Sequence, residues 1–247
     1  ITFLVPLGFH SSNDMLIDFS VRGWNRRPFN SNFLSWNGGD AVGQLFFKLI
    51  ENEKSTFGLS LGVRSLYEGS ALGGMTSFGE GLSGGFRLDY ELSKSSGIAF
   101  GAEQFVQFDD KTDTGRDIYL TFSKGIWLKK NNQYPIIVFT GGIGTGYFAL
   151  WKKNQFACSD MFGGASVDEH KYKQLCWGPF GTFSLVFNRK LATFFEYNNY
   201  AFMVGGSFNP QSKIRFTFGA TIAESYDDYK IKDFDELRWF SRFSIGI

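Results

Sequence analysis

The sequence of 247 residues contains only two cysteines, two histidines and five prolines. So few thiol and imidazole groups argue against a zinc site, and we expect neither a metal ion nor another cofactor. No run approaches the roughly 18 consecutive apolar residues that a helical membrane span requires. The formal net charge is +1, which argues against a nucleic-acid partner held by bulk electrostatics.

Phenylalanine and glycine, by contrast, are abundant, with 30 residues of each. In the stretch "KIRFTFGATI", Ile214, Phe216 and Phe218 share one parity, while Arg215 and Thr217 share the other. A period of two residues is typical of a β-strand with one apolar and one polar face. The pattern by itself fits two folds, because the apolar face meets the core in a soluble sandwich and the lipid in a membrane barrel.

The same alternation recurs along the chain and predicts twelve strands, with no convincing helix. The expected ranges are Met15–Trp24, Ala41–Ile50, Ser55–Tyr67, Glu80–Ser93, Gly97–Phe108, Arg116–Lys129, Tyr134–Ala149, Leu175–Asn188, Leu191–Asn199, Ala201–Asn209, Lys213–Ala223 and Glu236–Ile247. Most span about ten residues or more, whereas ordinary strands average about five or six. A tilted membrane strand needs about nine to eleven residues, so the strand lengths favour a membrane barrel over a soluble sandwich or soluble barrel.

Short and long connections alternate between these strands. The links "ENEK", "KSS", "RK" and "PQS" are short and polar, whereas most of the links between them are longer. Short turns at one end and long loops at the other are typical of an up-and-down antiparallel barrel in an outer membrane. We therefore predict an all-β fold, an up-and-down transmembrane barrel of about 12 strands over residues 15–247. Residues 1–14 form a segment that is either periplasmic or enters the lumen.

Charged residues gather at the polar parity of the predicted strands, which in a membrane barrel faces the lumen. We predict that the pore is lined by Arg22, Lys48, Arg64, Arg87, Glu103, Asp117, Glu196, Arg215, Arg238 and Arg242. Charges of both signs around a narrow lumen create a transverse field that sets solute preference.

Three places depart from the alternation. Lys124 falls at the lipid parity of its strand, where it is expected to snorkel to the rim or to contact a partner. Gln104 interrupts a lipid-facing row. The stretch "PIIVFTGGIGTGYF" is apolar at both parities and rich in glycine, so we expect a β-bulge there that switches the register.

Cys158 and Cys176 bracket a polar segment of the chain. A disulfide that closes this loop would stabilise the fold by about 3 kcal/mol in the loop-entropy description. We expect the bond in an oxidising compartment, and the alternative is two free thiols.

The chain from Met15 to Ile247 resembles a bacterial outer-membrane β-barrel of twelve strands. Its closing stretch "LRWFSRFSIGI" is similar to the C-terminal assembly signal of that class, with alternating Phe243, Ile245 and Ile247, although an aromatic residue is usual at the last position. The resemblance implies a mature chain in a bacterial outer membrane after removal of a signal peptide. It also implies contact with outer-membrane lipid, lipopolysaccharide and the barrel-assembly machinery, while the long loops suit a further protein partner.

The N-terminal region carries two more resemblances. The stretch "FLVPLGFHSSNDMLIDFSVRGW" is similar to the start of inverse-autotransporter barrels. "GFHSSND" followed by "RGWNRR" resembles the outer-membrane phospholipase motif, which implies His10 as base, Ser12 as nucleophile and Asn25 as the group that orients the imidazole. A strand of about ten residues would hold Asn25 roughly 30 Å from the other two, so we expect no catalysis.

Three functions stay open at this point. The first is a narrow porin-like channel for small polar solutes, or a plugged barrel. The second is a structural or interaction barrel in an outer-membrane complex, whose lumen charges only fill the interior. The third is a lipid hydrolase that uses His10 and Ser12.

Overall fold

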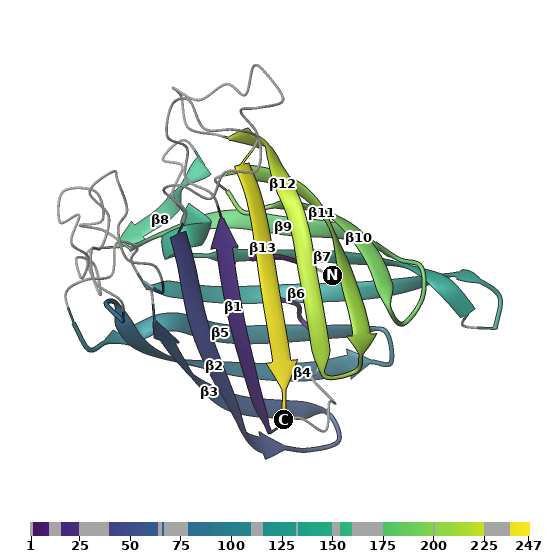
Figure 1. Cartoon of the computed structure of the whole chain (residues 1–247), viewed down its shortest axis with the longest axis horizontal. Helices are drawn as coiled ribbons and strands as arrows, with labels where there is room; N and C mark the ends of the chain where they lie inside the picture. The colour runs from purple at the N-terminus through teal and green to yellow at the C-terminus, as the bar shows by residue number, and fades with distance from the viewer. Residues whose placement is uncertain are drawn as a thin grey trace.

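The computed structural model describes residues 2–9, 16–24, 40–63, 66, 79–109, 116–131, 133–149, 154–159, 175–199, 201–224 and 238–247. These residues form a closed antiparallel β-barrel of twelve strands, with one short additional strand, β8, paired with the first residues of β9 (Figure 1). The strands are β1 Ile17–Trp24, β2 Asp40–Glu51, β3 Ser55–Val63, β4 Leu82–Ser93, β5 Ser96–Gln107, β6 Asp117–Lys129, β7 Gln133–Gly144, β8 Phe156–Ser159, β9 Leu175–Val186, β10 Leu191–Tyr197, β11 Ala201–Gln211, β12 Ile214–Glu224 and β13 Arg238–Gly246. Each barrel strand corresponds to one predicted strand, so the predicted fold class is confirmed.

Consecutive barrel strands pair in sequence order, and the first strand closes the ring on the last. At this seam, Val21 of β1 lies opposite Phe243 of β13, and Arg22 lies opposite Arg242. Closure leaves no sheet edge in the barrel, because every strand pairs on both sides. A short 3-10 helical turn, η1 (Gly146–Ala149), follows β7. In the described residues, no helix is long and apolar enough to cross a membrane.

The two faces of the barrel differ sharply in polarity. On β12, the side chain of Phe218 is 48% exposed on the outer face, whereas its neighbour Thr217 is 2% exposed on the inner face. The outer face carries Phe, Leu, Ile and Val, and the inner face carries hydroxyl groups and charges. This arrangement is the reverse of a water-soluble protein, in which the apolar face packs inside.

The inner face also holds rings that lie over glycines of the neighbouring strand. A Cβ added at Gly101 would approach the hydroxyl of Tyr119 to 2.5 Å, and one at Gly205 would approach the ring of Phe194 to 2.7 Å. Gly101 is the direct register partner of Tyr119, and Gly205 is the direct register partner of Phe194. Such ring-over-glycine pairs hold register in curved sheets.

The three departures from alternation have different outcomes. Gln104 has a positive φ of 54° at a register shift between β4 and β5, and its side chain is buried rather than part of an outer row. Lys124 donates a hydrogen bond from Nζ to Ser95 Oγ at 3.0 Å. The expected bulge within β7 is wrong: the register with β6 and β9 runs without a shift from Ile136 to Gly144, and the ring of Phe180 fills the space beside Gly142.

Candidate functional site in the barrel lumen

Residues 2–9 lie inside the barrel, and we call this segment the N-terminal plug. Figure 1 marks the N-terminal end within the outline of the strands. Phe3 is 2% exposed and packs against the rings of Phe194 and Phe240, with ring centroids 4.1 Å apart in the second pair. Val5 is equally buried, in a cluster with aromatic side chains of the wall and of η1: Tyr119, Phe148 and Phe180. The plug is thus seated in two apolar contacts with the lumen wall.

Glu196 of β10 anchors the start of the plug. Its carboxylate is fully buried and accepts backbone hydrogen bonds from Phe3 (2.8 Å), Leu4 (2.8 Å) and Val5 (3.2 Å). Three consecutive amides stabilise the charge of this one carboxylate, and hydrogen bonds to charged groups contribute about 1.5–3 kcal/mol each. The contact joins parts of the chain more than 190 residues apart.

The other end of the plug contacts strands β4, β5 and β6. Gly8 donates its backbone N–H to Ser123 Oγ at 2.8 Å, and Arg87 Nη2 donates to the Leu7 carbonyl at 2.6 Å. A Cβ at Gly8 would come within 2.6 Å of the Gly97 carbonyl oxygen. The plug therefore bridges β10 and the β4–β6 wall, and only glycine fits at its far contact.

Lumen charges pair across and along the wall. Arg22 Nη2 lies 3.3 Å from Glu103 Oε2, and Arg87 Nε lies 2.7 Å from Asp89 Oδ1. Asp117 is buried and accepts a hydrogen bond from the Tyr147 backbone at 2.6 Å. Arginines lie at the inner parity of β1, β12 and β13, and carboxylates lie at the inner parity of β1, β5, β6 and β10, so charges of both signs line the lumen.

The sequence-predicted lining residues fall into three groups. Arg22, Arg87, Glu103, Asp117, Glu196, Arg215, Arg238 and Arg242 lie at the inner parity of their strands. Lys48 lies at the inner parity near the short-turn end, with Nζ 2.6 Å from Glu51 Oε2. Arg64 lies outside the described residues, as do His10, Ser12 and Asn25 of the phospholipase-like motif.

Sequence reasoning included Glu196 and Arg87 but missed the aromatic rings and the hydroxyl group that contact the plug. The inner rings of Tyr119, Phe180, Phe194 and Phe240 stand at the polar parity of their strands, and each lies directly opposite a glycine on an adjacent strand. An aromatic residue at the polar parity facing a glycine is the signal that could have identified them. For Ser123, which accepts from Gly8 and also bonds Thr140 at 2.7 Å, the pattern holds no comparable signal.

A small pocket of about 20 Å³, with room for about one water molecule, lies beside Arg22. It is lined by side chains of β1 to β5 that include Gln44, Ser60, Ser83, Glu103 and Gln104. Amide, hydroxyl and charged groups around one small space suit a polar solute.

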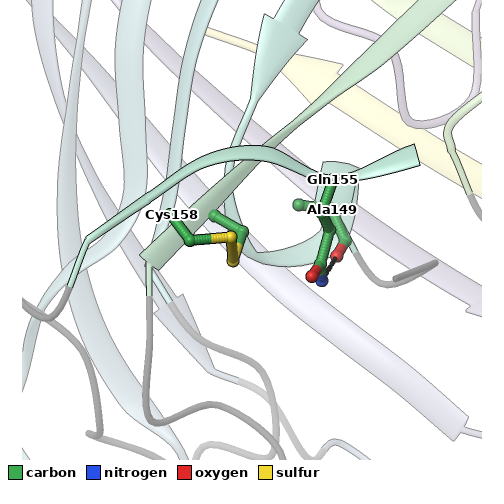
Figure 2. Close-up of a disulfide and its surroundings, with 4 residues drawn as sticks. Ala149, Gln155 and Cys158 are labelled. Carbon is green, nitrogen blue, oxygen red and sulfur yellow. Dashed lines mark hydrogen bonds between the residues drawn. A yellow bond between two sulfur atoms is a disulfide. The ribbon is translucent and has the colours of Figure 1, made fainter. Parts of the chain in front are cut away.

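The disulfide lies outside this region, on β8 and β9. The sulfur atoms of Cys158 and Cys176 are joined at 2.11 Å. Figure 2 shows the bond next to the hydrogen bond that Gln155 Nε2 donates to the Ala149 carbonyl at 2.5 Å. These contacts tie β8 to the wall and to η1.

The strand pairings and the lumen together define the class of protein: a closed twelve-stranded antiparallel β-barrel with an apolar outer face and a polar interior that holds a plug. No family model matches this chain, and no curated protein shows a significant match. Among solved structures, the chain is similar to the crystal structure of an outer membrane channel from Pseudomonas putida F1, with 11% sequence identity and a TM-score of 0.49 over 98% of this chain and 100% of that chain. The strand register of this chain by itself defines the fold.

Proposed function

We propose that this chain is a mature β-barrel of a bacterial outer membrane and forms a narrow channel for small polar solutes, restricted by the N-terminal plug. Exposed apolar side chains on almost every barrel strand support the membrane location, because soluble proteins rarely expose contiguous apolar surface on this scale. The partners that follow are outer-membrane lipid, lipopolysaccharide and the barrel-assembly machinery.

The observation that carries the channel function is the way the plug is held. Polar contacts from lumen groups to the backbone of residues 2–9 hold it, with Glu196 making three of them. In the described residues, the plug is joined to the wall by non-covalent contacts, among them one to the hydroxyl group of Ser123. A lumen lined in this way admits water and small polar solutes once the plug shifts.

Planar-bilayer recording of the purified full chain and of Glu196→Ala tests this proposal. Removing the carboxylate leaves three plug amides without their acceptor, so the plug should be released more often. We expect a small conductance in the native protein and a conductance at least about twofold larger in the variant.

Glu53→Ala is the matched control, because Glu53 is exposed in the β2–β3 turn, and its conductance should equal that of the native protein. Absence of any conductance in both the native protein and Glu196→Ala, with both folded, would contradict the channel function.

A second candidate is a structural or interaction barrel. The buried rings of Phe3, Phe194 and Phe240 favour it, since they fill part of the lumen as a packed core would. This candidate predicts an electrically silent barrel whose Glu196→Ala variant is destabilised without opening.

A further inference from the structure

Two guanidinium groups lie side by side in the lumen at the seam between β1 and β13. Arg22 and Arg242 are direct register partners, and strands of a sheet lie about 4.8 Å apart. The Nε atom of each is buried and has no hydrogen-bond partner among the residues that the structure describes. The hydroxyl of Ser244, two residues after Arg242 on β13, is also buried and has no hydrogen-bond partner among the described residues.

The remaining contacts of the two guanidiniums leave these donors free. Arg22 Nη2 donates to Glu103 Oε2 at 3.3 Å, and Arg242 Nη1 donates to the Phe3 carbonyl at 3.4 Å. Both bonds use terminal nitrogens, so the Nε–H groups point to neither acceptor. Buried donors without acceptors are rare in native proteins, and several together indicate an acceptor supplied by a ligand.

The charges around the seam favour an anionic acceptor. Arg215 of β12 lies opposite Ser244 in register, which adds a third guanidinium. The carboxylates that face this group are Asp18 on β1 and Glu103 on β5, both within electrostatic range of Arg242. The three guanidinium groups therefore outnumber the two carboxylates by one. Every unpartnered group named here is able to donate a hydrogen bond.

We propose that Arg22, Arg242 and Ser244 form a binding site for the oxyanion group, a carboxylate or a phosphate, of a small solute. Two guanidinium N–H groups and a hydroxyl match the acceptor oxygens of such a group. The small pocket beside Arg22, with the amides of Gln44 and Gln104 at its wall, adds room for a group about the size of a water molecule. The transport role of the site rests on the proposed channel function, whereas the binding itself does not.

Isothermal titration calorimetry tests the site. The sample is the purified, folded full chain in detergent and a chloride buffer, and the probes are sodium acetate and inorganic phosphate, added separately. We expect saturable binding of at least one probe. Arg242→Gln should weaken it by about tenfold or more, and so should the double variant Arg22→Gln/Glu103→Gln, which leaves no unpaired carboxylate. Ser244→Ala changes little volume and should weaken binding by about threefold or more.

Arg189→Gln is the matched control, since this arginine lies in the exposed β9–β10 turn, and it should bind as the native protein does.

Binding of acetate alone identifies carboxylate solutes, binding of phosphate alone identifies phosphorylated solutes, and either result supports the site. No saturable binding of either probe, or binding unchanged in all three lumen variants, overturns it. A barrel that binds a probe but never conducts overturns the channel and keeps the site, whereas a conducting barrel without saturable binding overturns the site alone.

Discussion

Single residues decide how tightly the plug fits its lumen. The backbone of Gly8 lies so close to β5 and β6 that a Cβ would be 2.6 Å from the Gly97 carbonyl oxygen and 2.8 Å from the Ser123 nitrogen. Both are backbone atoms of the barrel wall, and neither moves without distorting a ladder of hydrogen bonds. A larger residue at position 8 is therefore accommodated by displacement of the plug.

Gly8→Val should release the plug while the barrel stays folded. We expect a larger single-channel conductance than in the native protein, and unchanged heat-dependent mobility on a gel. The control is Gly125→Ala, another glycine at the inner parity, where the nearest atom to an added Cβ is Ile136 Cγ2 at 3.7 Å. A Gly8→Val protein that is folded and conducts as the native protein does would contradict a plug seated on this glycine.

Among the elements, β8 is the one that depends most on a covalent bond. It contains four residues, all exposed, and pairs with β9 at only two positions, Phe156 with Trp177 and Ser159 with Leu175, with a register shift between them. So short a ladder is marginal by itself. The bond from Cys158 to Cys176 therefore carries much of the attachment of β8.

We expect both thiols to be bonded in protein isolated without reductant, so alkylation followed by mass spectrometry should detect neither as free. In the double variant Cys158→Ala/Cys176→Ala, loss of the loop constraint should cost the attachment of β8 about 3 kcal/mol. Amide hydrogen exchange should then speed up in β8 and stay unchanged in β4 and β5, which lie in the barrel wall. Free thiols in the native protein, or equal exchange in the two proteins, would contradict this role.

At the scale of the whole molecule, the reversed polarity of the two faces determines the surroundings of the barrel. An apolar outer face is stable against hydrocarbon and unstable against water. The polar inner face, with its ion pairs and the plug, keeps its hydrogen bonds inside the closed ring.

A fluorophore attached at position 218 should be quenched by brominated lipid, whereas one attached at position 217 should be spared. The reason is that Phe218 lies on the outer face and Thr217 on the inner face of β12. The measurement compares the two labelled proteins in the same vesicles, with unbrominated lipid as the reference. Quenching at 217 alone, equal protection of both positions, or a monomer that is soluble without detergent would each contradict a membrane barrel.

The sequence alone predicted the twelve barrel strands and the face to which most of their side chains belong, whereas it predicted neither β8 nor η1. Alternation of Phe216, Thr217 and Phe218 is a local property of an extended backbone, so it can be read from neighbours in the chain. The charged lining, including Arg22 and Arg242, followed from the same parity. The period-two pattern failed where local order breaks, as at Gln104, whose bulge shifts the register.

Only the tertiary structure decided what the lumen contains. In the sequence, Glu196 is one more charge at the polar parity and Phe3 is one more aromatic residue near the start of the chain. Their contact joins positions 193 residues apart, and it exists because closure of the barrel brings β10 beside residues 2–9. The unpartnered Nε atoms of Arg22 and Arg242 are likewise a product of closure, because β1 and β13 meet only when the ring is complete.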